Sequence, residues 1–420
     1  GSTTGTVSFT PTDDSVYEGN ETATIAVSSV SGGSATESGS QSVTITITEN
    51  ESAPTVTLAT SATSIAENAG TSLTLTATLS VATTADVTVA LSTSGTATEG
   101  TDYTDGSGNL DDIVISAGST TGTISFTPTD DSIYDATSNE TAGISVSAVS
   151  GGGASENGSQ AVTITITDND SAPTLTLSTS ASSIAENAGS SLTLTATLSN
   201  GTYQDVTAAL GTTGTATEGT DYTDGSGSID DITISAGATT GSVSFTPTDD
   251  SIVEANETAI IAVTGVSGGS ATESGSQSQT ITITDDDSGS FSVADVTVDE
   301  DAGTATFTVS ASNAFSSDVT IDYATSNGTA TAGSDYTAAS DTLTFSAGDT
   351  SKTFTVSITD DALDEDNETS TITISNASDG SISDSTAILT ITDDDATPSL
   401  SINDVSTTDE SNTSTNMTVT

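Results

Sequence analysis

A long internal repeat is the feature that most restricts how this chain can fold. The segment PTVTLATSATSIAENAG, which begins at Pro54, returns almost unchanged as PTLTLSTSASSIAENAG from Pro173, 119 residues later. A diverged copy that includes FSVADVTVDEDAG runs from about Gly289, and another begins near Thr397. Repetition of this kind is typical of similar units arranged in tandem. We therefore expect an array of domains rather than one large core.

The order of motifs within a copy divides the chain into five segments. A full copy shows an opening strand, the turn IAENAG, a long alternating strand, GTATxGxDY, FTPTDD and a closing TITITD. Full copies occupy residues 53–171, 172–288 and 289–396, whereas residues 1–52 carry the second half of a copy and residues 397–420 its first strands. The sequence thus reads as a window from a longer repetitive protein.

Strict alternation of apolar and polar residues predicts that these units are all-β. In the segment SLTLTATLS, the residues Leu73, Leu75, Ala77 and Leu79 fall on one face and threonine falls on the other. This period of two is typical of half-buried strands, and clusters of Ser, Gly, Asn and Asp separate the strands. About seven short strands in each copy predict tandem antiparallel two-sheet β-sandwiches with Ig-like connections, which form an extended rod.

Charge restricts the possible partners. The chain has 59 Asp and Glu residues against a single basic residue, Lys352, which gives a formal charge of −58. Nucleic acid is excluded, because phosphate binding needs Lys and Arg, and an anionic membrane surface is disfavoured for the same reason. Two carboxylates about 4 Å apart repel by roughly 4 kcal/mol at an effective dielectric constant near 20. Divalent metal or high salt is therefore implied.

Two further classes of site are excluded by composition. Cysteine and histidine are absent, so the chain has neither disulfides nor zinc sites built from these residues. The longest apolar runs fall far short of the ~20 residues that a membrane-spanning helix needs.

The acids gather at the ends of predicted strands, at corresponding places in each copy. In residues 53–171 and 172–288 the candidate ligands are Glu67, Asp102, Asp130, Asp131, Asp135, Asp168 and Asp170, and then Glu186, Asp221, Asp249, Asp250, Glu254, Asp285, Asp286 and Asp287. Carboxylates brought together at one end of a sandwich need a hard cation with six to eight oxygen ligands, and calcium is the common one. The alternative, a solvated or halophilic acidic surface, does not explain the repeated register.

With these motifs the copies resemble Calx-β domains, a family of calcium-binding β-sandwiches. The resemblance spans essentially the whole chain and rests on IAENAG, GTATxGxDY, DDxxxExNET and the closing DDD. It implies that calcium ligands come from these four motifs. The implied ligands in the other segments are Asp13, Asp14, Glu18, Glu49 and Glu51; Glu300, Asp335, Asp360, Asp361, Glu365, Asp393, Asp394 and Asp395; and Glu410.

Two segments depart from the family pattern at their closing acids. The opening segment ends in Glu49, Asn50 and Glu51, and residues 53–171 end in Asp168, Asn169 and Asp170, so each loses the middle acid of the triplet. The second of these segments also has Asp135 where the next has Glu254. We expect weaker or fewer bound ions there.

Each closing acidic run lies directly before the next copy, so bound calcium would sit at a junction between domains. The leading hypothesis is a structural segment of an extracellular fibre or cell-surface stalk, stiffened by calcium and in contact with neighbouring repeats, with lateral association into fibres left open. The alternative is a calcium-dependent adhesin that binds cells, sugars or surfaces. An enzyme is disfavoured, because a metal-loaded acid is a poor proton shuttle and the same acids recur in every copy. The NET triplets also read as glycosylation acceptors, although a structural role suits their fixed place in the motif better.

Overall fold

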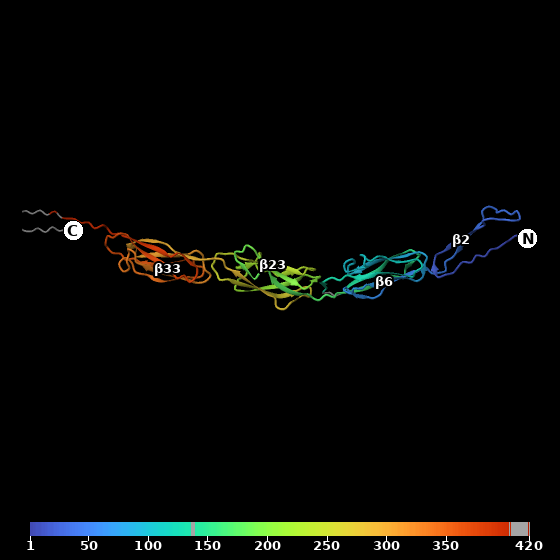
Figure 1. Ribbon diagram of the computed structural model, residues 1–420, viewed down its shortest axis with the longest axis horizontal. Helices are drawn as coiled ribbons and strands as arrows, with labels where there is room; N and C mark the ends of the chain where they lie inside the picture. The colour runs from blue at the N-terminus through green and yellow to red at the C-terminus, as the bar shows by residue number, and fades with distance from the viewer. Residues whose placement is uncertain (136–138, 403, 405–418, 420) are drawn as a thin grey trace, which may run out of the picture.

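The computed structural model describes residues 1–135, 139–402, 404 and 419. Figure 1 shows an elongated molecule in which the opening segment and three β-sandwiches follow one another in a row. Strands β6, β23 and β33 mark the three sandwiches in that order. The predicted all-β fold of tandem sandwiches is confirmed.

Residues 53–171 form two packed five-stranded sheets. Their strand orders are β14-β4-β6-β11-β9 and β10-β8-β13-β15-β5. The strands are β4 (Thr55–Thr60), β5 (Ser64–Ala66), β6 (Leu73–Leu79), β8 (Val87–Gly95), β9 (Tyr103–Thr104), β10 (Ile113–Ile115), β11 (Thr121–Pro128), β13 (Glu140–Ser150), β14 (Ser155–Glu156) and β15 (Ala161–Thr167), with short β7 (Ala82–Thr83) and β12 (Ile133–Tyr134) beside them.

Residues 172–288 repeat the same two sheets. Their orders are β21-β23-β18-β16-β25 and β17-β26-β24-β20-β22. The strands are β16 (Thr174–Thr179), β17 (Ser183–Ala185), β18 (Leu192–Leu198), β19 (Gly201–Thr202), β20 (Val206–Gly214), β21 (Tyr222–Thr223), β22 (Ile232–Ile234), β23 (Thr240–Pro247), β24 (Glu257–Ser267), β25 (Thr272–Glu273) and β26 (Ser278–Thr284).

Residues 289–396 form a four-stranded sheet, β32-β29-β27-β34, against a five-stranded one, β28-β35-β33-β30-β31. A single 3₁₀ turn, η1, holds the counterpart of the IAENAG turn. The elements are β27 (Ser290–Val293), β28 (Val296–Asp299), η1 (Glu300–Ala302), β29 (Thr304–Ala311), β30 (Val319–Ser326), β31 (Ser340–Phe345), β32 (Ser351–Ser357), β33 (Glu368–Ser375), β34 (Ser381–Asp384) and β35 (Thr386–Thr392).

The alternating pattern determines which side chains fill each sandwich. In β6, Leu75, Ala77 and Leu79 are buried while the intervening threonines are only partly covered. The aromatic residues reinforce the same core, since the buried rings of Tyr103 and Phe126 stack with centroids 4.6 Å apart. Tyr222 and Phe245 repeat this stack at 4.7 Å. Burial of whole aromatic rings compensates for the low apolar content of the chain.

The sandwiches contain more strands than the seven expected in each copy. The opening strand of residues 53–171 divides into two, because β4 pairs in one sheet and β5 crosses to pair in parallel with β15 in the other. Very short strands such as β9 and β14 then complete the sheet edges. Alternation alone does not predict such a division, since both parts keep the same period of two.

The opening segment contributes β1 (Val16–Tyr17), β2 (Glu21–Ala26) and β3 (Ser42–Ile47). Strands β2 and β3 pair antiparallel, as β24 and β26 do in a full sandwich. Residues 1–52 have no counterparts of β16, β18 and β20, which cover this pair elsewhere. Apolar side chains such as Phe9, Val27 and Val43 are consequently exposed.

Short backbone pairings join each repeat to the next. Strand β1 pairs in parallel with β7, and β12 pairs in parallel with β19 of the following repeat. At the third junction a single bridge links Val253 to Phe315. Its backbone hydrogen bonds run from Val253 N to the Ala314 oxygen (2.9 Å) and from Ser316 N to the Val253 oxygen (3.0 Å). We call these three contacts the joints.

A glycine substitution tests how tightly the first joint is packed. Gly153 and Gly158 both have φ of +67°, but a Cβ at Gly153 would lie 2.7 Å from Cε1 of Tyr17, whereas a Cβ at Gly158 meets nothing within 4 Å. We expect Gly153→Ala to displace Tyr17 and to speed amide hydrogen exchange severalfold in β1 and β7. Gly158→Ala carries the same backbone strain and serves as the control. Equal exchange in the two variants would contradict a packed joint.

Candidate metal sites

The predicted acids lie at one end of each sandwich, and in residues 53–171 and 172–288 this is the end that meets the next repeat. In residues 53–171, Glu67 follows β5, and Asp168 and Asp170 follow β15, the parallel partner of β5. Carboxylate oxygens of these three residues lie within 4.8 Å of one another. The backbone holds them there, because Glu67 N donates to the Thr167 oxygen at 3.1 Å.

The acid group of residues 172–288 is centred on Glu186. Oxygens of Glu186, Asp250 and Asp287 lie within 4.8 Å of one another, and so do oxygens of Glu186, Asp249 and Asp286. Only 7% of the Glu186 surface is exposed. Acids that are distant in sequence thus surround one buried carboxyl group.

Glu300 is central in the same way in residues 289–396. It lies within the same 4.8 Å limit of Asp360 and Asp394, and separately of Asp393 and Asp395, and only 6% of its surface is exposed. A pocket lined by Glu300 and Asp393 also brings in Asp335, Asp361, Glu365 and Glu368. The candidates predicted in this repeat therefore gather at one end of the sandwich.

The remaining predicted residues are placed as follows. Asp221, Glu254 and Asp285 line a pocket with Glu186, and Asp135 lines the corresponding pocket of residues 53–171 with Glu67 and Asp168. Asp102 and Asp130 lie in the loops around these acids, where Asp102 Oδ2 accepts from Thr98 N at 2.6 Å. Asp13, Asp14, Glu18, Glu49 and Glu51 line a pocket in the opening segment. Glu410 lies outside the described residues.

The sequence prediction missed a glutamate in each of the three full repeats, and also Asp366 in the last of them. Glu140, Glu257 and Glu368, the glutamates of the NET triplets, line the same pockets as the predicted acids. Burial, followed by repulsion from the nearby Asp221, raises the pKa of Glu257 to about 7. Their fixed place in the NET triplet, directly after its asparagine, was the available signal.

The asparagine of the NET triplet has a structural role in two of the repeats. The Asn256 side-chain oxygen accepts from Asp285 N, and the Asn367 side-chain oxygen accepts from Asp393 N, both at 3.3 Å. Each asparagine thus fixes the start of the closing acidic run. This contact supports the structural interpretation of the triplet.

The opening segment shows how the first closing acid is held. Glu49 Oε2 accepts from Glu18 N at 2.5 Å and from Gly19 N at 2.8 Å, while its Oε1 accepts from Glu51 N at 2.9 Å. These amide donors, that of Glu51 first, lower the pKa of Glu49 to about 2. The carboxylate of Glu49 therefore stays ionised.

The central glutamates show the opposite behaviour. Burial raises the pKa of Glu186 to about 7, with Asp285 the largest charged contributor. Burial likewise raises the pKa of Glu300 to about 7, followed by repulsion from Asp393. A carboxyl group is forced toward its protonated form when no cation balances its neighbours.

Several carboxylate oxygens in these groups have no hydrogen-bond donor. Buried oxygens without a partner include Asp170 Oδ2, Glu186 Oε1, Asp287 Oδ2, Glu300 Oε1, Asp393 Oδ1 and Asp395 Oδ2. A buried polar atom without a partner is costly, and in a native protein it points to an ion or a water molecule. A purely oxygen donor set of this charge fits calcium.

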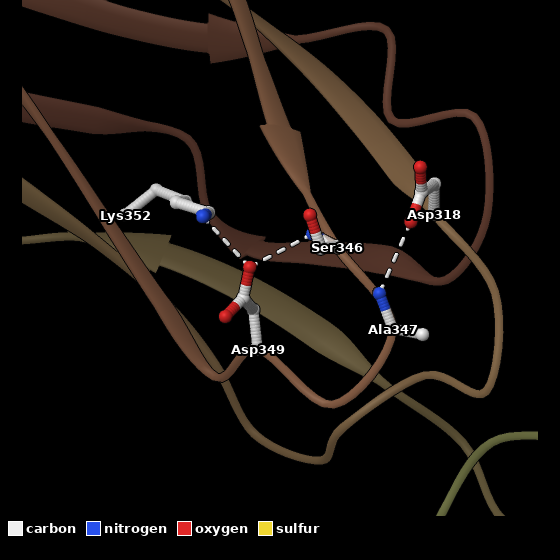
Figure 2. Close-up of polar contacts among 5 residues, drawn as sticks. All are labelled: Asp318, Ser346, Ala347, Asp349 and Lys352. Atoms are coloured by element: carbon white, nitrogen blue, oxygen red, sulfur yellow. Dashed lines mark hydrogen bonds and ion pairs between the residues drawn. The ribbon is translucent and has the colours of Figure 1, made fainter.

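The protein has no cationic side chain to spare for these sites. Its single basic residue, Lys352, pairs through Nζ with Asp349 at 2.7 Å (Figure 2). Asp349 also accepts from Ser346 N at 2.8 Å, and Asp318 accepts from Ala347 N at 3.1 Å. Lys352 thus stabilises the turn between β31 and β32, and the acid groups need a cation from solution.

Fold and site together define a tandem array of acidic β-sandwiches with a candidate metal site at one end of each. A family model described as "Calx-beta domain" matches residues 1–51, 49–170, 168–287 and 284–395. The chain belongs to the Calx-beta family, whose domains bind calcium in homologues. The resemblance inferred from the sequence motifs is therefore confirmed.

Comparison with solved structures finds calcium-binding domains of Calx. The apo form of the Calx CBD1 domain is 27% identical over 26% of this chain and 100% of its own, with a TM-score of 0.25. CBD12 from CALX1.2 is 18% identical over 52% of this chain and 99% of its own, also with a TM-score of 0.25. Membership of the family rests on the four matched ranges. Comparison with curated proteins finds no match, and among the described residues no helix is long and apolar enough to cross a membrane.

The raised pKa values predict opposite effects of pH with and without calcium. A glutamate whose pKa rises from 4.5 to about 7 on folding favours the folded state below pH 4.5, and this contribution is lost as pH rises through 7. In chelator we therefore expect Tm to fall between pH 5 and pH 8. In calcium it should rise over the same range, because protons compete with the ion. Circular dichroism melts measure both slopes, and slopes of the same sign would refute the metal sites.

Replacing a central glutamate separates charge repulsion from metal binding. At pH 8 we expect Glu186→Gln to raise Tm in chelator, because it removes a buried charge, and to weaken calcium binding by at least about tenfold. Calorimetric titration and thermal melts provide the two measurements. Asp230→Asn removes an exposed acid of the same repeat and should change neither. A variant that binds calcium like the parent chain would exclude Glu186 as a ligand.

Proposed function

We propose that this chain is a structural segment of an extracellular fibre or cell-surface stalk, stiffened by calcium at the junctions between its repeats. Three observations support this proposal. The repeats belong to a calcium-binding family, the molecule is elongated (Figure 1), and acids with unpartnered oxygens lie where one repeat meets the next.

A single side chain links site and joint, and this observation carries the proposal. The second aspartate of the DD pair accepts a hydrogen bond from the amide two residues later, where the joint strand begins. Asp131 Oδ1 accepts from Ile133 N at 2.7 Å, and Asp250 Oδ1 accepts from Ile252 N at 2.7 Å. Asp14 and Val16 repeat the contact at 2.8 Å, as do Asp361 and Leu363.

The same aspartates lie among these acids, since Asp131 is one of the neighbours that, after burial, raise the pKa of Glu67, so metal binding and joint geometry are connected. Ile133 starts β12, which pairs with β19 of the following repeat, while Asp250 lies within 4.8 Å of Glu186 and Asp287. A cation held by these acids would remove their repulsion and fix the aspartate that shapes the joint strand. We infer that filling the site restricts bending between repeats.

Calcium and an extracellular location suit the site better than the alternatives. Magnesium demands near-octahedral coordination with few protein ligands, whereas these groups supply many carboxylate oxygens. Extracellular calcium modules bind with dissociation constants of about 10⁻⁴ to 10⁻³ M, which millimolar calcium outside the cell satisfies. An adhesive role finds less support, because the rings of Tyr103, Phe126 and Tyr222 are buried and cannot stack on sugars.

Small-angle X-ray scattering of the whole chain tests the proposal. In millimolar calcium we expect a larger maximum dimension and a narrower distribution of lengths than in chelator, with little effect of magnesium. Thermal unfolding should shift to higher temperature in calcium alone. If calcium changes neither length nor Tm, the acids are a solvated surface and the proposal is wrong.

A pair of substitutions provides the matched control. Asp131→Asn and Asp250→Asn keep a side-chain oxygen that can accept from the amides of Ile133 and Ile252, but remove one negative charge from each site. We expect the double variant to fold, yet to lengthen and stiffen less in calcium. Asp230→Asn with Asp111→Asn, two exposed acids away from the site groups, should behave like the parent chain.

A further inference from the structure

The second joint differs from the others in one side chain. Tyr203 directly follows β19, the strand of residues 172–288 that pairs with β12 of the preceding repeat. Its hydroxyl donates to Asp131 Oδ2 at 3.3 Å, and its side chain lines the acid pocket of residues 53–171 beside Glu67 and Asp168. The following repeat therefore supplies a polar group to a site that belongs to its neighbour.

The corresponding positions at the other two joints carry much shorter side chains. Aligning the motif before β8, β20 and β30 places Thr84 and Ser316 where Tyr203 stands. The hydroxyl groups of Thr84 and Ser316 lie close to the backbone, whereas the hydroxyl group of Tyr203 lies at the far end of an aromatic ring. The second joint alone thus has a phenol available for the acid pocket.

The repeat that receives this phenol also has fewer closing acids than the repeat that follows it. Residues 53–171 have Asn169 where the next repeat has Asp286, and Asp135 where the next has Glu254. The backbone N–H of Asn169 donates to Glu67 Oε1 at 3.4 Å, and the side chain of Asn169 adds no carboxylate. A neutral hydroxyl group that reaches Asp131 orients one of the remaining acids without adding charge.

Asp131 thereby becomes the meeting point of three contacts. Its Oδ1 accepts from Ile133 N of the joint strand, its Oδ2 accepts from Tyr203 of the next repeat, and the acids around it belong to the site. Docking of the next repeat and binding of an ion would each restrict the motion of the Asp131 carboxylate. Restriction of one group by two binding events couples those events thermodynamically.

We propose that Tyr203 is a positioning residue that completes the calcium site of residues 53–171 from the following repeat. Docking of residues 172–288 and calcium binding by residues 53–171 then strengthen each other. This inference rests on the proposed function, because it assumes that the acid groups bind calcium. The inference adds that the site of residues 53–171 depends on the following repeat. The site centred on Glu186 lacks this dependence, because the matching residue of its following repeat is Ser316, which has no phenol group.

Site-resolved hydrogen exchange of the whole chain, measured across a calcium titration, tests this dependence. Peptides from β13 and β15 report on residues 53–171, and peptides from β24 and β26 report on residues 172–288. We expect Tyr203→Phe to raise the calcium midpoint of the first group by about tenfold and to leave the second unchanged. Thr84→Val, which removes a hydroxyl at the matching position of the first joint, should shift neither.

The same titration separates the possible failures. If both groups of peptides gain protection in calcium with midpoints unaffected by Tyr203→Phe, the role of Tyr203 is wrong and the calcium sites stand. If calcium protects neither group in the parent chain, both proposals are wrong. If Tyr203→Phe already speeds exchange of β12 and β19 in chelator, the residue acts through the joint alone and its role at the site is refuted.

Terbium provides an independent readout of proximity. The chain has no tryptophan, so terbium emission excited at tyrosine wavelengths reports on tyrosines near the bound ion. We expect Tyr203→Phe to lower this emission at saturating terbium, whereas Tyr323→Phe, which removes a hydroxyl from a ring packed on Phe354, should not. Unchanged emission in Tyr203→Phe would overturn the placement of the phenol beside the ion.

Discussion

Mutual repulsion among carboxylates is the constraint on which the organisation of this protein depends. Each sandwich core is closed by ordinary apolar packing, with Tyr103 on Phe126 and its equivalents at the centre. The ends of the sandwiches are not balanced in the same way, because Glu186 and Glu300 are buried among other acids with an oxygen lacking any donor. The single lysine is committed to Asp349. Balance must therefore come from ions in solution.

The acids that need a cation lie where one repeat meets the next. The DD pairs belong to the acid groups and also hold the first amide of each joint strand, so local charge and the direction of the chain are set by the same residues. A protein whose domains were joined by ordinary linkers would lack this connection, since flexible linkers do not transmit geometry. Here the acid groups and the joints form one structural unit.

The sequence predicted most of the fold and much of the site, for reasons visible in particular residues. The alternation of Leu73 to Leu79 specified inward and outward faces, and the fixed register of Glu67, Glu186 and Glu300 indicated acids that converge. Glu257 was missed because the ligands were assigned to the DD pair and the acid that follows it, whereas the NET triplet was interpreted as structural. The joints were missed because a two-residue strand such as β12 has no periodicity, and its partner lies in another domain. Tyr203 gives no signal until that pairing is known.

The parallel pairing of early and late strands determines how force would pass through the array. Strand β5 lies near the start of its sandwich and β15 at its end, yet they run side by side in the same direction, as β28 and β35 do over four residues. Tension applied along the rod pulls the start of β5 and the end of β15 in opposite directions. It therefore loads their hydrogen bonds together in shear rather than one after another. The acids that follow both strands stand at the end of this pair, so a shared ion would fasten the two tension-bearing strands together.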